Sequence, residues 1–125
     1  TGLVDNLKRY VHENELSEHV SFLGFIDRNE MLNLMHYSAA VIQPSLSEGW
    51  STVVEDAKSL GKFVIASDLE LHKEQLQNNF TLFKARESDS LVAAIKNFVE
   101  EPPELVDTDY QENIRVFGEK FYEYI

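Results

Sequence analysis

The 125-residue chain predicts an α/β fold, in which a parallel sheet carries helices on both faces. Four short, apolar, β-rich runs alternate with amphipathic segments that have the spacing of helices. The connections between them are short, and no repeat, low-complexity tract or linker interrupts the alternation. Hydrophobic residues make up 43% of the chain, which is enough to build a core. Together these observations favour one domain with strands buried between layers of helices.

The beginning of the chain predicts two helices and one strand. The first helix is indicated by apolar residues that recur every three or four positions: Leu3, Leu7, Tyr10 and Val11. A β-rich run near residues 20–24 predicts the first strand, which is cut by Gly24. The second helix follows a start that resembles a capping box, in which Asp27 precedes Glu30 by three residues.

The middle of the chain predicts the centre of the sheet. The run AAVIQPS predicts a strand at 40–43 that is buried on both faces. A helix from about Ser51 follows and ends at Gly61, a residue type suited to the position after a helix. Two further runs, near residues 63–67 and 80–84, predict the third and fourth strands, with the short helix LHKEQL between them.

The last part of the chain predicts two more helices. The segment SDSLVAAIKNFVEE is typical of a helix whose N-cap is Ser88 or Asp89 and which ends at a double proline. That double proline is the one break in the organisation. We therefore expect residues 1–101 to form the main body of the domain and residues 102–125 to form a C-terminal helical segment.

Composition and charge exclude several functional classes. Asp and Glu number 22 against 11 Lys and Arg, a net charge of −11, and no basic cluster suited to a nucleic-acid backbone is present. The chain has no Cys, and its four His are isolated, so no metal-ligand pattern is seen. No apolar run approaches the roughly 20 residues of a membrane span. We expect no nucleic-acid partner, no bound metal and no transmembrane segment.

The stretch PSLSEGWSTVVEDAKSLGKFVIASD places carboxylates on both sides of a strand-to-helix turn. Ligands of open parallel sheets bind beyond the carboxyl ends of the strands. The helix after Gly49 directs free N–H groups and its positive dipole end toward that place, which suits an anion such as pyrophosphate. Glu48 on the loop and Asp56 inside the helix can accept hydrogen bonds from ribose or sugar hydroxyls. From spacing alone, the alternative is that Glu48 only interacts favourably with the helix dipole and that Asp56 is a solvated helix residue.

The same stretch resembles the E-x7-E segment of the retaining glycosyltransferases of family 4, also called glycosyl transferases group 1. The positions that match the family pattern are Pro44, Ser45, Glu48, Gly49, Trp50, Ala57, Gly61, Val64, Ala66, Ser67 and Asp68. The segments before and after it are similar to the family as well, so the resemblance covers most of the chain in order. Two positions depart from the pattern, since Asp56 replaces the second Glu and Ser51 replaces the second Gly.

The resemblance implies a Rossmann-like fold, as a truncated C-terminal domain of a GT-B glycosyltransferase that binds a nucleotide sugar. Such an enzyme would move a hexosyl group, with retention, from a nucleoside diphosphate sugar to a glycan or lipid-linked acceptor, as in polysaccharide biosynthesis. The N-terminal acceptor domain and the basic phosphate contacts have no counterpart in this sequence, so the chain alone is expected to be inactive. The resemblance implies no cofactor, and a cytoplasmic location, with the inner face of the membrane as the alternative if the missing part attaches there.

The resemblance also assigns site residues. The nucleotide-sugar site is expected to comprise Glu48, Gly49, Trp50, Ser51, Thr52, Asp56, Phe25 and Ile26. Glu48 would be the catalytic residue at the donor-sugar hydroxyls and Asp56 would bind the ribose, while backbone N–H groups of the turn would face the β-phosphate. Glu55 is expected to point about 100° away round the helix, so that its removal should change little. The alternative is that a shifted helix start gives Glu55 the role assigned to Asp56.

Other side chains have a mainly structural interpretation at this stage. Trp50 is expected to pack along the crevice rather than to serve as a stacking platform. His36 is expected at the surface. His72, at a helix start, is interpreted as structural, with a position in the crevice as its alternative.

Two other functions compete with a glycosyltransferase. A noncatalytic α/β binding module, such as a receiver-like domain, would need an acidic cluster at the first strand, and none is present. A GT-B type nucleotide-sugar epimerase would also use two carboxylates, but the E-G-W context fits transferases better.

Overall fold

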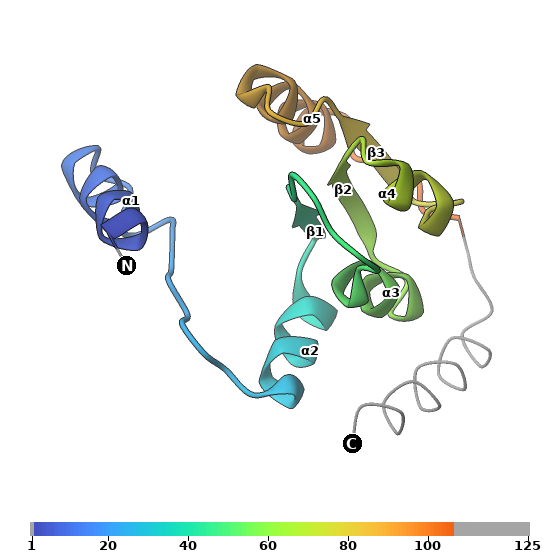
Figure 1. The fold of residues 1–125 in the computed structure, drawn as a ribbon, viewed down its shortest axis with the longest axis horizontal. Helices are drawn as coiled ribbons and strands as arrows, with labels where there is room; N and C mark the ends of the chain where they lie inside the picture. Colours follow the sequence, from blue (N-terminus) through green and yellow to red (C-terminus); the bar gives the residue numbers. More distant parts are fainter. Residues whose placement is uncertain (1, 107–125) are drawn as a thin grey trace. The chain divides into compact units, whose positions relative to one another are not determined.

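The structure is a computed structural model that describes residues 2–106. Figure 1 shows its helices and strands in order along the chain. They are α1 (Gly2–Glu13), α2 (Arg28–Tyr37), β1 (Ala40–Gln43), α3 (Thr52–Ser59), β2 (Phe63–Ser67), α4 (Glu70–Gln75), β3 (Phe80–Phe83) and α5 (Ser88–Glu100). Residues 1–30 and 31–125 form two compact units, and each is described by itself. The final helix predicted from the sequence lies outside the described residues.

The sheet confirms the predicted α/β architecture. Its strands lie in the order β1–β2–β3, and both neighbouring pairs are parallel. Gln43 at the end of β1 lies opposite Ala66, and Ser67 at the end of β2 lies opposite Phe83. Consecutive strands are connected by α3 and by α4. The carboxyl ends of all three strands therefore meet at one edge of the sheet.

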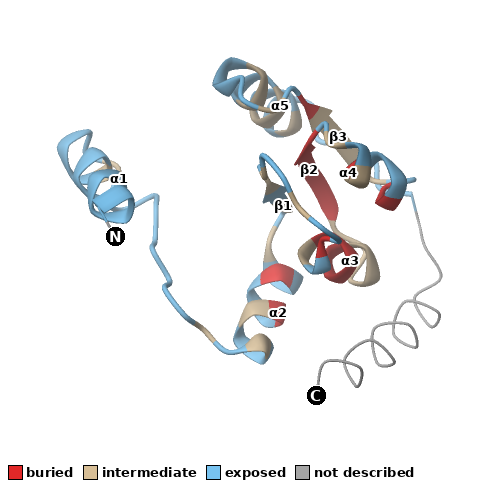
Figure 2. Cartoon of the chain, in the orientation of Figure 1, coloured by how far each residue is buried: buried red, intermediate tan, exposed pale blue. Residues whose placement is uncertain are grey.

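The core lies on both faces of β2, all five residues of which are buried (Figure 2). Successive side chains of a strand point to opposite faces. Val64 and Ala66 pack on one face in a cluster that is shared with α2, α3 and α4: Met35, Val54, Ala57 and Leu76. Phe63 and Ile65 pack on the other face against α5, where the Phe63 and Phe98 rings lie 5.2 Å apart between centroids. Helices thus cover both faces, as the sequence predicts.

The turns around α3 and α2 follow their sequence signals. The Ser51 hydroxyl caps α3 by accepting the backbone N–H of Val54 at 3.2 Å. Gly61 follows this helix with a φ of +68°, the left-handed conformation that glycine adopts without strain. The Asp27 carboxylate accepts the N–H of Glu30 at 2.8 Å, so the predicted helix start is confirmed.

Three predictions about the elements are wrong. The strand β1 is not buried on both faces, because it lies at the edge of the described sheet, and its Ile42 is 42% exposed. Residues 20–24 form no strand, because a strand needs a hydrogen-bonded neighbour and the unit 1–30 has no other strand in its described residues. In addition, α5 begins at Ser88 and its N-cap is Glu87, not Ser88 or Asp89. The Glu87 side chain makes no capping bond, and the hydroxyl of Ser90 instead accepts the N–H of Lys84.

Candidate functional site

The loop that follows β1 holds the Glu48 carboxylate at the carboxyl edge of the sheet. Gln43, the last residue of β1, donates from Nε2 to Oε1 of Glu48 at 2.8 Å. His72 of α4 places its Nε2 2.7 Å from Oε2 of the same carboxylate. The Glu48 side chain is 21% exposed, so a ligand can still reach it. Two elements beyond the loop therefore fix the orientation of an accessible acid.

The His72 ring connects this acid to the end of β2. Its Nδ1 lies 2.8 Å from the backbone carbonyl oxygen of Ser67, and because a carbonyl only accepts, Nδ1 carries a proton. The hydroxyl of Ser67 in turn donates to the backbone oxygen of Ser45 at 2.6 Å. The Gln43 amide also reaches the Ser45 hydroxyl at 3.0 Å. This network ties the ends of β1 and β2, the loop and α4 into one arrangement around Glu48.

The surroundings of Glu48 favour its charged form. Partial burial is the largest influence and raises its pKa. Hydrogen bonds from His72, Gln43 and Ser45, together with the charge of His72, lower it and outweigh the burial. The pKa of Glu48 consequently lies below its ordinary value of 4.5. An ionised carboxylate at this edge can accept hydrogen bonds from hydroxyl groups.

The first turn of α3 is held by a second side chain of α4. Gln75, which is buried, accepts the N–H of Ser51 at Oε1 (3.3 Å) and donates from Nε2 to the backbone oxygen of Ser51 (3.0 Å). The Ser51 N–H is therefore already bonded within the protein. The next two N–H groups, those of Thr52 and Val53, have no acceptor inside the helix by its geometry, whereas the N–H of Val54 is bonded to the Ser51 hydroxyl. They and the dipole of α3 form the end of the helix that suits an anion.

The structure gathers six of the eight predicted binding residues on one loop and helix start. Gly49, Trp50 and Thr52 are exposed there, whereas Ser51 and Asp56 are buried. Asp56 is only 2% exposed, so its carboxylate is not open to solvent in this structure. Trp50 is 58% exposed, so packing does not hold it as expected.

Phe25 and Ile26, the other two predicted binding residues, belong to the unit 1–30. Their place in the site stays a prediction. His36 lies exposed in the last turn of α2, as predicted.

Glu55 is not the uninvolved side chain that its angle predicts. It is 9% exposed, and its Oε1 accepts from Gln75 Nε2 at 3.0 Å and from Lys58 Nζ at 3.4 Å. Helix α4 packs against α3. Glu55, about 100° round the helix from Asp56, therefore faces α4.

Three polar residues of the site were not predicted with these roles. For His72 the crevice was only the alternative, and Gln43 and Gln75 were not singled out. The available signal was the spacing of three between His72 and Gln75, which places both side chains on one face of α4.

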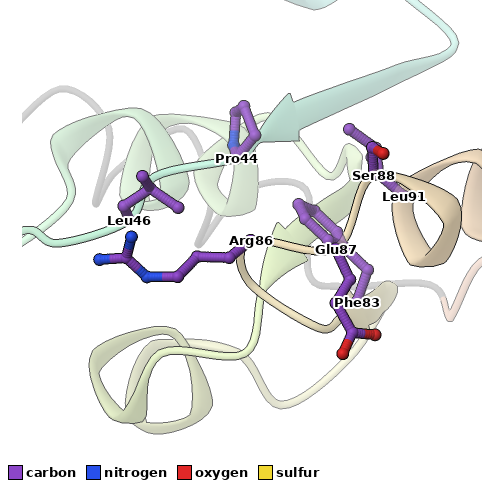
Figure 3. Close-up of a pocket in the computed structure, with 7 residues that line it drawn as sticks. All are labelled: Pro44, Leu46, Phe83, Arg86, Glu87, Ser88 and Leu91. Carbon is purple, nitrogen blue, oxygen red and sulfur yellow. The ribbon is translucent and has the colours of Figure 1, made fainter.

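A separate cavity of about 260 Å³ lies beside the site at the same edge of the sheet (Figure 3). It is lined by Pro44, Leu46, Phe83, Arg86, Glu87, Ser88 and Leu91. Leu46 shares the loop with Glu48, and Figure 3 shows the Arg86 side chain extending toward it. The cavity is bordered by mainly apolar residues and does not contain the Glu48 carboxylate.

Two further features are absent from residues 2–106. None of the helices there is both long and apolar enough to cross a membrane. In the same residues, no group of three or more His, Asp or Glu side chains is arranged to hold a metal ion.

Comparisons with known proteins agree with this arrangement. The family of glycosyl transferases group 1 matches residues 2–117. The O-antigen chain mannosyltransferase RfbU of Salmonella typhimurium is 30% identical over 106 residues, which cover 85% of this chain and 30% of that protein. The phosphatidylinositol N-acetylglucosaminyltransferase gpi3 subunit of Schizosaccharomyces pombe is 27% identical over 108 residues, 86% of this chain and 22% of that protein.

Solved structures show the same fold over part of their length. HepE of Anabaena, solved in complex with UDP, superposes with a TM-score of 0.69 at 28% identity over 78% of this chain and 27% of that one. Sucrose-phosphate synthase of Thermosynechococcus elongatus superposes with a TM-score of 0.70 at 23% identity over 78% of this chain and 25% of that one, a likeness of fold. The chain thus spans less than a third of the proteins it resembles. The family match covers nearly all of its residues, and the chain belongs to the glycosyl transferases group 1 family.

Proposed function

We propose that this chain is the donor-binding part of a retaining GT-B glycosyltransferase of family 4. The enzyme moves a hexosyl group from a nucleoside diphosphate sugar to a glycan or lipid-linked acceptor. Relatives named as a mannosyltransferase and an N-acetylglucosaminyltransferase support glycosyl transfer, and the UDP complex of HepE supports a nucleotide donor. The observation that carries the proposal is the ionised Glu48, oriented by Gln43 and His72 just before the N-terminus of α3.

In this proposal the two features serve different parts of the donor. The Glu48 carboxylate accepts hydrogen bonds from hydroxyls of the transferred sugar. The N–H groups of Gly49, Trp50 and Thr52 and the dipole of α3 face the β-phosphate. Negative charge develops on that phosphate as the sugar leaves, so donors already aimed at it stabilise the transition state. The Ser51 N–H is bonded to Gln75, and Ser51 therefore contributes by capping the helix.

The remaining roles extend beyond the Glu48 loop and the first turn of α3. Asp56 is proposed to bind the ribose, which requires its buried carboxylate to become accessible in the complex. Phe25 and Ile26 are proposed to lie beside the base. The acceptor is proposed to bind an N-terminal domain outside this sequence, and the enzyme is proposed to work in the cytoplasm or at the inner face of the membrane.

Trp50 is the one Trp of this sequence and lies beside Gly49, so its fluorescence is a direct probe of the site. Titration of the chain with UDP, GDP and ADP should change this fluorescence in a saturable way for at least one nucleotide, and inorganic phosphate should not reproduce the change. Ser51→Ala, which removes the cap of α3, should weaken the response, and the exposed Glu70→Gln should not. If no nucleoside diphosphate gave a saturable change, donor binding by this chain would be refuted.

A further inference from the structure

Helix α4 presents two polar side chains to the interior. His72 is 0% exposed and Gln75 is 1% exposed, although the helix is only six residues long. Burial of polar groups costs free energy unless their hydrogen bonds are satisfied. Both side chains are satisfied by the segment that contains Glu48 and the start of α3. Leu76, the residue after the helix, belongs to the apolar core.

His72 contacts Glu48 from the interior of the protein. Its Nε2 lies 2.7 Å from Oε2, while Oε1 is held by Gln43 from the other side. The ring itself is anchored at Nδ1 by the carbonyl of Ser67, at 2.8 Å. A ligand at the exposed part of the carboxylate would therefore meet Glu48 and not His72. His72 is held rigidly and donates to Glu48 without reaching the ligand. It therefore fixes both the rotamer and the charge of the Glu48 carboxylate.

We propose that His72 is a positioning residue, which orients the Glu48 carboxylate for the donor sugar. The proposal rests on the function proposed above. A charge-assisted hydrogen bond is about twice as strong as a neutral one, and its geometric constraint is strict. Loss of this bond leaves the acid held only by Gln43 and Ser45, near its own loop, so it should sample orientations that do not meet the sugar.

A matched pair of substitutions separates the two ring nitrogens. The amide nitrogen of Asn falls near the position of Nδ1 and can keep the bond to Ser67, but it is too short to reach Glu48. The amide nitrogen of Gln falls near Nε2 and can keep the bond to Glu48. The variants are made in the protein that carries this chain, and kcat, KM for the nucleotide sugar and Kd for the nucleoside diphosphate are measured. His36→Asn, at an exposed histidine of α2, is the control.

His72→Asn is expected to lower kcat about tenfold with a change in nucleotide Kd below about threefold, whereas His72→Gln stays within about threefold of wild type. In a Glu48→Gln background, His72→Asn should lower kcat by less than about threefold, since the acid it positions is gone. Equal losses of kcat in the Asn and Gln variants, or additive losses in the double variant, would overturn the proposal. If His72→Asn does not fold, His72→Gln decides alone. It keeps the bond to Glu48, so a tenfold loss of kcat in this folded variant would also overturn the proposal.

The result also separates this proposal from the function on which it rests. A wild-type protein that transfers no sugar from any nucleoside diphosphate donor would refute the proposed function and this role with it. An active wild type with no difference between the two His72 variants would refute the positioning role alone.

Discussion

Gln75 should be one of the most sensitive positions for stability, although it lies outside the proposed donor contacts. Its amide makes three hydrogen bonds across to α3: it accepts the Ser51 N–H and donates to the Ser51 carbonyl and to Glu55. Each neutral bond contributes about 1 kcal/mol net, and the bond to a carboxylate about 1.5–3 kcal/mol. Gln75→Leu removes all three bonds while keeping a buried side chain of similar size. We expect the free energy of unfolding to fall by about 3.5–5 kcal/mol, a large part of the about 5–15 kcal/mol typical of a domain.

Urea unfolding of the chain at neutral pH, followed by circular dichroism, measures this change. Gln77→Leu is the matched control, because Gln77 is exposed and, within residues 2–106, its side chain bonds only to the nearby backbone oxygen of Glu74. It should change the free energy of unfolding by less than about 0.5 kcal/mol. Gln75→Glu is a second test, since it keeps an acceptor for the Ser51 N–H but loses both donated bonds. A loss below about 1 kcal/mol for Gln75→Leu would show that these bonds contribute little, contrary to our reasoning.

The remaining predictions concern the acids and the chain as a whole. In the protein that carries this chain, Glu48→Gln should lower kcat more than it lowers nucleotide affinity. Asp56→Ala should instead weaken nucleotide binding by about 1.5–3 kcal/mol. Steady-state kinetics combined with binding titrations distinguish these effects. Glu55→Ala should lower thermal stability, because it removes the contacts to Gln75 and Lys58; unchanged melting would contradict this. The folded-state pKa of Glu48 is lowered, so its stabilising contribution is present above pH 4.5 and is lost as the pH falls through the lowered pKa. The free energies of unfolding of wild type and Glu48→Gln should therefore converge toward acid pH. This chain alone should transfer no sugar from any nucleotide donor, and measurable turnover by it would disprove that expectation.

The sequence predicted the elements whose signal is local. Apolar runs located β1, β2 and β3 to within a residue, and the Asp27, Ser51 and Gly61 signals at the helix ends are confirmed. The strand expected at 20–24 failed because pairing is not local. Its composition suits a strand, but strand formation depends on a neighbour that the unit 1–30 does not supply.

The site was predictable where the chain itself connects its parts. The loop from Glu48 and the first turn of α3 are contiguous, so a motif can identify them together. The contacts of Glu48 with His72 and of Ser51 with Gln75 each join residues 24 positions apart. Periodicity shows that two α4 residues share a face, but it does not show what that face meets.

The error at Glu55 follows from the same limit, and it changes how the acids should be tested. Its removal was expected to change little, because its angle round α3 relative to Asp56 turns it away from the crevice. In the structure α3 has neighbours on more than one side, since it contacts β1, β2 and α4. Glu55 therefore meets Gln75, and its removal perturbs the fold instead of serving as a neutral control. Glu70, an exposed acid of α4, is the better control for the charge of this region. Its partner Lys73 is also exposed, and within residues 2–106 neither side chain forms a hydrogen bond with the loop of Glu48.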